Sequence, residues 1–347
     1  MNSPSLQGVL RPGLTPSAIV KHLDQYVVGQ DEAKKTIAVA VYTHYRKIGR
    51  VAHTSEFAGS IKSNILLIGP TGSGKTLLCE TLSRLLGVPF VTADAPSLAQ
   101  TEFIGHEIEA ILQRLLDQAD DDMSRAQQGI VFIDEVDKLK AVSQQSRSGS
   151  GEGVQNALLK IMEGSLVRLA DRRAIDTTHI LFICGGAFVG LEQILATSKS
   201  FGFIATSNDD NQKILDRLNS RVKPNDLFTY GLIPEFAGRL PIVTRMQPLG
   251  REQLVRIMIE PRNALYRQFR ELFRQEGVEL SIKPGVFEQI ADMAIEYKIG
   301  ARALRGIFEE MVTPALYLIP DRPDIKQVVF SSLFEEARLV GTETKPS

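Results

Sequence analysis

Cysteine, long apolar runs and an excess of charge of either sign are scarce or missing in this 347-residue sequence. Its two cysteines, Cys79 and Cys184, are too few for a four-cysteine zinc site, and their apolar neighbours favour buried thiols over a disulfide. No run of about eighteen apolar residues occurs, so no membrane-spanning helix is predicted. The net charge of -1 gives no support for nucleic-acid binding. Residues 1–16 lack a charged-then-apolar leader, and we therefore expect a cytoplasmic protein.

A glycine-rich segment, residues 69–76, fits the pattern G-x-x-x-x-G-K-[ST]. An apolar, strand-like run precedes it and a helical pattern follows it. The alternative is a chance glycine turn, which would have no reason to lie between a strand and a helix. Such a loop directs backbone N–H groups and the positive end of a helix at phosphate. We expect Lys75 to reach the β- and γ-phosphates of a nucleotide and the Thr76 hydroxyl to hold Mg²⁺. The residues assigned to nucleotide binding here are Pro70, Thr71, Gly72, Ser73, Gly74, Lys75, Thr76 and Leu77.

A second apolar run, residues 130–134, ends in two carboxylates, Asp134 and Glu135. We expect Asp134 to bind the Mg²⁺ shell, directly or through water, and Glu135 to orient and polarise the attacking water. Phosphoryl transfer to water depends on such positioning and charge stabilisation. An acidic pair at the end of a strand is, taken alone, an ordinary solvated turn. Behind a P-loop, it predicts an ATPase.

Apolar runs and helical patterns alternate in the first two thirds of the chain, which predicts an α/β fold with a parallel sheet flanked by helices. The predicted strands are residues 64–68, 89–92, 130–134 and 179–184. After residue 248 the pattern is mostly helical, with helices predicted at 251–260, 263–276, 284–297 and 301–319 and a strand at 327–330. We expect a flexible segment, a large nucleotide-binding domain, a smaller mostly helical domain and a flexible tail, at residues 1–15, 16–246, 247–334 and 335–347.

An ordered series of longer strings resembles the AAA+ ATPases and, among them, the ClpX family of protein unfoldases. The resemblance extends from Pro16 to Ile319. Besides the P-loop and the acidic pair, it rests on Tyr26–Gln30, Gly151–Gln155, Gly231–Phe236, Gly238–Pro241 and Gly300–Arg302. It implies the P-loop AAA+ fold, ATP and Mg²⁺ as cofactors, and a homo-oligomeric ring, by resemblance a hexamer.

Three residues outside the two motifs gain a role from the resemblance, and each has a plainer alternative. Tyr26–Gln30, with Val28 among them, would wrap the adenine base; otherwise Val27 and Val28 are core residues. Arg239 would be an arginine finger that reaches the γ-phosphate held by a neighbouring subunit; otherwise it is a surface ion-pair partner. Arg302 would be the sensor-two arginine that couples nucleotide state to the angle between domains; otherwise it is an arginine at a helix start. No polar first sensor is expected at Cys184-Gly185-Gly186.

The resemblance also implies mechanical parts. Phe103, Ile104 and Gly105 align with the family's pore loop, which grips unfolded polypeptide through an aromatic and a branched apolar side chain. The alternative is a core phenylalanine. Arg147 would lie on a second pore loop, although a Ser/Gly-rich segment is commonly just a loop. Residues Phe201, Gly202 and Phe203 align with the loop that docks on a ClpP-type peptidase; otherwise the two rings fold back on their own subunit.

Two departures from the family pattern bear on substrates. The N-terminal zinc-binding domain of the family has no counterpart here, and the pore-entrance segment is shortened to residues 165–176. The implied function is an ATP-driven unfoldase that threads unfolded or tagged proteins into a ClpP-type peptidase. A peptidase-independent remodelling chaperone is the alternative. Neither nucleic acid nor a membrane is expected as a partner, and the sequence does not identify substrates or adaptors.

Overall fold

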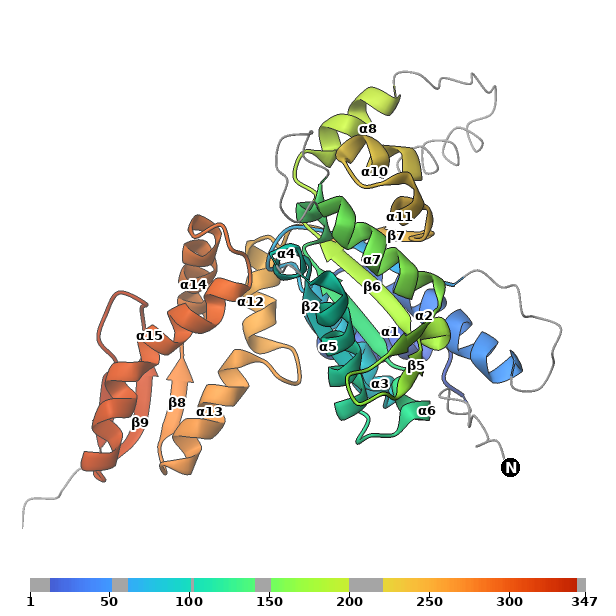
Figure 1. The fold of residues 1–347 in the computed structure, drawn as a ribbon. Helices are drawn as coiled ribbons and strands as arrows, with labels where there is room; N and C mark the ends of the chain where they lie inside the picture. The colour runs from blue at the N-terminus through green and yellow to red at the C-terminus, as the bar shows by residue number, and fades with distance from the viewer. Residues whose placement is uncertain (1–12, 52–61, 101–102, 141–150, 200–220, 342–347) are drawn as a thin grey trace, which may run out of the picture. The chain divides into compact units, whose positions relative to one another are not determined.

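The computed structural model describes residues 13–51, 62–100, 103–140, 151–199 and 221–341 (Figure 1). These residues form two compact units. The larger unit contains most of the chain up to Met246. The smaller unit contains the residues after Met246 together with two earlier segments, 21–30 and 71–74, which the sequence had placed in the large domain.

The larger unit is built on a five-stranded parallel sheet with the strand order β2-β3-β6-β1-β7. Its strands are β1 (Ile65–Ile68), β2 (Phe90–Asp94), β3 (Ile130–Asp134), β6 (Leu181–Gly186) and β7 (Ile242–Arg245). A two-stranded antiparallel hairpin, β4 (Leu166–Arg168) and β5 (Ala174–Asp176), forms within residues 165–176. The predicted parallel α/β sheet is thus confirmed.

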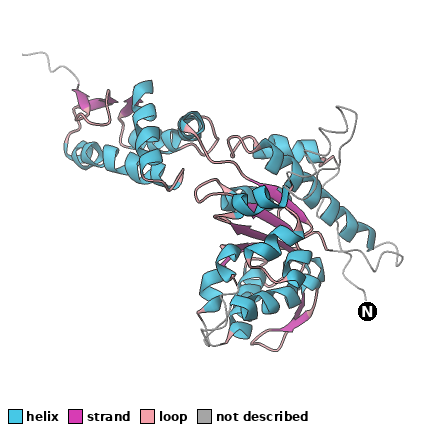
Figure 2. Cartoon of the chain, turned by 90° about the horizontal axis from the view of Figure 1, so that it is seen from above, coloured by secondary structure: helices cyan, strands magenta, loops and turns pink. Residues whose placement is uncertain are grey.

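Helices cover both faces of this sheet, as Figure 2 shows in a view from above. Every residue of β1 and β6 is buried, as a central parallel strand requires. Alternate residues of the sheet, among them Leu66 and Val131, share one apolar cluster with two of the covering helices, α5 and α7. The helices are α1 (Pro16–Leu23, which runs into the smaller unit), α2 (Asp31–Val51), α3 (Lys75–Leu86), α4 (Ala95–Ala99), α5 (Ile104–Asp117), α6 (Met123–Ala126), α7 (Gly151–Glu163), α8 (Leu191–Lys199), α10 (Pro224–Tyr230) and α11 (Pro234–Gly238), with 3₁₀ turns η2 (Val136–Leu139) and η3 (Thr177–His179).

The smaller unit packs four helices against a three-stranded sheet of order β10-β9-β8. Phe269 and Phe308 stack at its centre with ring centroids 4.8 Å apart. Its elements are α12 (Arg251–Ile259), α13 (Leu265–Gln275), β8 (Glu279–Ile282), α14 (Pro284–Glu296), α15 (Arg302–Leu318), the 3₁₀ turn η4 (Ile319–Asp321), β9 (Ile325–Phe330) and β10 (Arg338–Gly341). A smaller, mostly helical domain after residue 246 was the predicted architecture.

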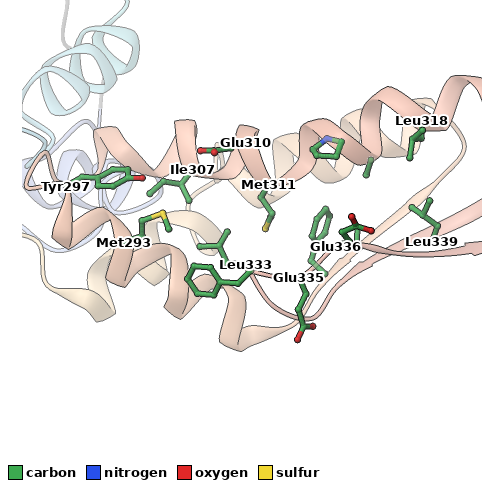
Figure 3. Close-up of a pocket in the computed structure, with 15 residues that line it drawn as sticks. Met293, Tyr297, Ile307, Glu310, Met311, Leu318, Leu333, Glu335, Glu336 and Leu339 are labelled. Carbon is green, nitrogen blue, oxygen red and sulfur yellow. The ribbon is translucent and has the colours of Figure 1, made fainter.

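The flexible tail expected at residues 335–347 is wrong in part, because β10 lies within it and pairs antiparallel with β9. Leu339 explains the difference: it packs against the core of the smaller unit. The same unit has an apolar groove of about 590 Å³ between α14, α15 and the chain leading to β10. Figure 3 shows Met293 of α14 and Met311 of α15 beside Leu333, with Glu310, Glu335 and Glu336 also lining the groove.

Candidate active site

The loop between β1 and α3 has the backbone conformation that phosphate binding needs. Gly72 and Gly74 have φ values of +76° and +96°, in the left-handed region that side chains with a β-carbon rarely adopt. Gly72 is constrained twice, because a β-carbon built on it would lie 2.4 Å from the carbonyl oxygen of Ile299. The loop ends where α3 begins, at Lys75, so its N–H groups lie at the positive end of a twelve-residue helix.

Two buried polar side chains of the loop fit an anionic ligand. Lys75 is 8% exposed, and its Nζ donates hydrogen bonds to the carbonyl oxygens of Gly69 at 2.7 Å and Pro70 at 3.1 Å. The hydroxyl of Ser73 is buried and has no hydrogen-bond partner among the described residues. A buried hydroxyl without a partner is costly and points to a missing ligand or water. The loop therefore suits the phosphate groups of a nucleotide.

The acidic pair lies at the same edge of the sheet as the loop. Parallel pairing places Ile68 of β1 beside Gly186 of β6, and Cys184 of β6 beside Ile133 of β3. The carboxyl ends of β1 and β3 are therefore separated by one strand. Burial and the nearby charge of Asp134 raise the pKa of the Cys79 thiol, which lies one turn after Thr76 on α3. Thr76, at the start of α3, and Asp134, at the end of β3, therefore lie at the same edge of the sheet.

Asp134 and Glu135 have different surroundings. Asp134 is half-buried, and its Oδ1 accepts a hydrogen bond from the Glu135 backbone N–H at 2.9 Å. Glu135 is exposed and has φ +59°, ψ +32°, an uncommon left-handed conformation for a residue with a side chain. Backbone strain of this kind is concentrated at functional sites. A β-carbon on Gly185 would lie 3.1 Å from Asp134 Oδ1, so the end of the neighbouring strand presents backbone to this carboxylate.

Arg239 lies at the C-terminal end of α11, where it caps the helix, and not at the acidic edge of its own sheet. Its guanidinium forms an ion pair with Glu163 at 2.7 Å, and its side chain is 46% exposed. An arginine so placed can be reached by another chain. In the isolated subunit Arg239 is thus a surface ion-pair partner, as its plainer alternative predicts.

The other two residues that the resemblance assigns to the nucleotide site, Val28 and Arg302, lie in the smaller unit. Val28 is buried. Arg302 is the exposed first residue of α15, directly after Gly300 and Ala301. A β-carbon on Gly300 would lie 3.0 Å from the carbonyl oxygen of Thr71, so the start of α15 is packed against the P-loop backbone.

Comparison with known proteins agrees with this geometry. Residues 60–243 match the model of the AAA domain (Cdc48 subfamily), and residues 249–327 match that of the C-terminal, D2-small domain of ClpB protein. The ATP-dependent Clp protease ATP-binding subunit ClpX 3 of Methylococcus capsulatus is 46% identical over 344 residues, covering 90% of this chain and 78% of that protein. The ClpX subunit of Porphyromonas gingivalis is 41% identical over 93% of this chain and 82% of its own length. That of Azotobacter vinelandii is 44% identical over 90% and 76%.

The chain belongs to the ClpX family of AAA+ ATPases. The sequence resemblance and the predicted ATPase activity are thereby confirmed. Within the described parts of this ClpX-family chain, no helix has the length and apolar character needed to cross a membrane.

The residues predicted to form a pore loop in this ClpX-family chain differ from one another in exposure. Phe103 is 65% exposed and stacks on His106 with ring centroids 5.5 Å apart, so it is not a core residue. Ile104 begins α5 and packs against the apolar core, while Gly105 follows it within the helix. Phe103 is thus the most exposed apolar candidate of the three. Arg147 and the docking residues Phe201, Gly202 and Phe203 lie outside the described residues.

Gln30 is the last residue of the string that would wrap the adenine base, and its side chain makes specific backbone contacts. Gln30 has φ +62°, and its Nε2 donates to the carbonyl oxygens of Gln247 at 2.9 Å and Ser73 at 3.4 Å. Its Oε1 accepts from the Gln247 N–H at 2.8 Å. Gln30 therefore ties the P-loop to the residue at which the smaller unit resumes. Its place at the end of the string Tyr26–Gln30 was the available signal.

Proposed function

We propose that this protein is an ATP-driven, ring-forming unfoldase that threads protein substrates through a central pore, into a ClpP-type peptidase. The observation that carries the proposal is the placement of Lys75, Asp134 and Glu135 at one edge of the sheet. The names of the ClpX relatives, ATP-binding subunits of an ATP-dependent Clp protease, support it. The proposal includes a ring of identical subunits, by family resemblance a hexamer, and a location in the cytoplasm.

The chemistry follows from the residues at this edge. The P-loop backbone, Lys75 and the buried Ser73 hydroxyl bind and orient the β- and γ-phosphates of ATP, and Val28 lies against the adenine. Thr76 and Asp134 would hold Mg²⁺, which would supply positive charge to the phosphates. Glu135, exposed at the strand end, accepts a proton from the attacking water and orients it. Arg302 extends from the start of α15, which packs on the P-loop, and senses the bound nucleotide.

Arg239 acts in trans in this proposal. It lies at the opposite end of α7 from the acidic edge, beside Glu163, so it serves the site of a neighbouring subunit. Exposed ion pairs contribute about 0–1 kcal/mol. The Glu163 partner therefore presents little barrier to moving the guanidinium onto a phosphate, where it stabilises transition-state charge.

The mechanical parts are Phe103, Ile104 and Gly105 in one pore loop and Arg147 in a second. The exposed ring of Phe103 supports a grip on extended polypeptide that does not depend on sequence. We assign residues Phe201, Gly202 and Phe203 to docking on the peptidase. Several copies of this segment on one ring bind together by multivalency. Unfolded or tagged proteins are the substrates, with no nucleic-acid or membrane partner.

The proposal is tested by measuring ATP hydrolysis, unfolding of a stable fluorescent protein and peptidase-dependent degradation on the same preparation. Phe103→Ala is expected to keep ATP hydrolysis near the parent rate and to reduce unfolding at least tenfold, about the loss expected when the grip is removed. Val189→Ala, which removes a 76% exposed apolar side chain elsewhere in the larger unit, is the matched control and leaves both unchanged. Unfolding by Phe103→Ala at the parent rate would contradict the pore assignment.

Peptidase docking needs a separate measurement. Deletion of residues 201–203 is expected to abolish binding of a ClpP-type peptidase and to leave ATP hydrolysis and unfolding intact. If docking survives the deletion, the loop assignment is wrong. If the parent ring binds no peptidase, a peptidase-independent remodelling chaperone is the better description.

A further inference from the structure

Two buried amide side chains fix the two ends of the short helix α11, which carries Arg239. Gln155, on α7, is fully buried, and its Oε1 accepts a hydrogen bond from the backbone N–H of Ile233, the residue that caps the start of α11, at 2.8 Å. Asn64 is 1% exposed, and its Nδ2 donates to the carbonyl oxygen of Arg239, the cap at the other end, at 3.1 Å. The five-residue helix is therefore held by side chains from elsewhere in the chain.

One further hydrogen bond of Gln155 and the strand that follows Asn64 connect the two amides to the active site of the same subunit. Gln155 Nε2 donates to the carbonyl oxygen of Leu139 at 2.7 Å, at the end of the 3₁₀ turn η2 that follows Glu135. Asn64 directly precedes β1, whose other end enters the P-loop, and it also donates to the carbonyl oxygen of Met162 at 3.2 Å. Each end of α11 is thus connected to one of the two nucleotide motifs.

The chemistry of both positions requires an amide. Gln155 donates with one group and accepts with the other, which neither a carboxylate nor an apolar side chain can do. Asn64 donates twice from one nitrogen, while its Oδ1 is buried and has no partner among the described residues. An aspartate has the same size as Asn64, but its carboxylate cannot donate these two hydrogen bonds.

We infer that Gln155 and Asn64 are positioning residues for Arg239. Through these two amides, the nucleotide site of one subunit sets the position of the Arg239 that acts on the site of the next subunit. The inference rests on the proposed action of Arg239 in trans. A misplacement of about 1 Å costs about 10²-fold in rate. Loss of either amide should therefore lower kcat by roughly 10- to 100-fold, while binding of a non-hydrolysable ATP analogue, which depends on the subunit's own P-loop, changes less than about twofold.

Mixed rings separate this role from support of the subunit's own site. Gln155→Met subunits keep Lys75, Asp134 and Glu135 but misplace Arg239. Glu135→Gln subunits keep a well-placed Arg239. We expect a one-to-one mixture of the two to hydrolyse ATP faster than either variant alone, and a mixture of Gln155→Met with Arg239→Ala to show no gain. Gain in the second mixture, or parent-like turnover by Gln155→Met alone, would overturn the inference.

Controls keep the result interpretable. Gln128→Met replaces another buried glutamine of the larger unit and should retain parent turnover. Asn64→Asp should repeat the Gln155→Met pattern, and it takes over the test if Gln155→Met does not fold. A gain from mixing Arg239→Ala with Glu135→Gln is the reference for action in trans. Without that gain the proposed role of Arg239 fails, and the positioning role falls with it. A tenfold loss of analogue affinity in both amide variants would assign them to their own site.

Discussion

The two ends of β1 differ in the groups that act there: backbone groups at the carboxyl end and a side chain at the amino end. At its carboxyl end the work is done by backbone: two glycines in the left-handed region, a helix start and the carbonyl oxygens that Lys75 contacts. At its amino end a side chain, Asn64, connects α7 to the cap residue Arg239. The two ends of this four-residue strand therefore differ: backbone shapes the loop at one end, and an amide side chain fixes the proposed arginine finger at the other.

The largest effect is expected at the amino end. Arg239→Ala should lower ATP turnover by about 10³- to 10⁵-fold, because an arginine finger stabilises charge that develops only in the transition state. Analogue binding should stay near the parent value. Steady-state ATPase assays and calorimetric titration measure the two quantities. Parent-like turnover would reduce Arg239 to the surface partner of Glu163.

The next largest effect is expected at Glu135, the acidic residue that follows β3 at the carboxyl edge of the sheet. Glu135→Gln should lower turnover by about 10²- to 10⁴-fold with analogue binding nearly intact, because an amide cannot take a proton from water. The same two assays apply. A variant that hydrolyses ATP near the parent rate would remove Glu135 from the general-base role.

The backbone of the P-loop can be tested with a matched pair of glycines. Gly72→Ala should weaken ATP binding at least tenfold, because its β-carbon would meet the Ile299 carbonyl oxygen and because a left-handed non-glycine residue costs about 1–2 kcal/mol. Gly87, with φ +69° and no atom within 4 Å of its β-carbon position, has the conformational cost without the clash. Gly87→Ala should therefore bind ATP like the parent. Equal affinities for Gly72→Ala and Gly87→Ala would contradict the steric argument.

The smallest predicted effect is a pH dependence near the amino edge of the sheet. Burial lowers the pKa of His44 from 6.5 to about 4, against a hydrogen bond with the His179 carbonyl oxygen, and Lys62, His179 and Lys47 add positive charge nearby. The unfolded chain therefore binds a proton between pH 6.5 and 4 that the folded chain does not. The free energy of unfolding is highest above pH 6.5 and falls on acidification, by at most about 3 kcal/mol from this group.

Denaturant unfolding at several pH values measures this slope. His44→Gln should flatten it between pH 6.5 and 4, whereas His106→Gln, at an exposed histidine, should leave it unchanged. An unchanged slope in His44→Gln would show that other groups account for the acid sensitivity.

Local pattern made the carboxyl end predictable. A single continuous stretch of sequence forms each feature there: the P-loop, the acidic pair and four of the five parallel strands. Each was predicted to within a few residues of its observed bounds. The strands β4, β5, β7, β8 and β10 were missed because each has only three or four residues, with polar or charged ones among them. The amide contacts of the amino end join residues 78 and 175 positions apart, so no local pattern could reveal them. The role of Arg239 came from family resemblance alone.

The central claim is that a subunit hydrolyses ATP with an arginine from its neighbour, and a mixing titration tests it most directly. Arg239→Ala and Glu135→Gln subunits, each nearly inactive, are combined at fixed total concentration and varied ratio, and ATP turnover is measured. We predict a maximum at intermediate ratios, because some interfaces then pair an intact Glu135 with an intact Arg239. Turnover that follows the weighted sum of the two variants at every ratio would contradict the account.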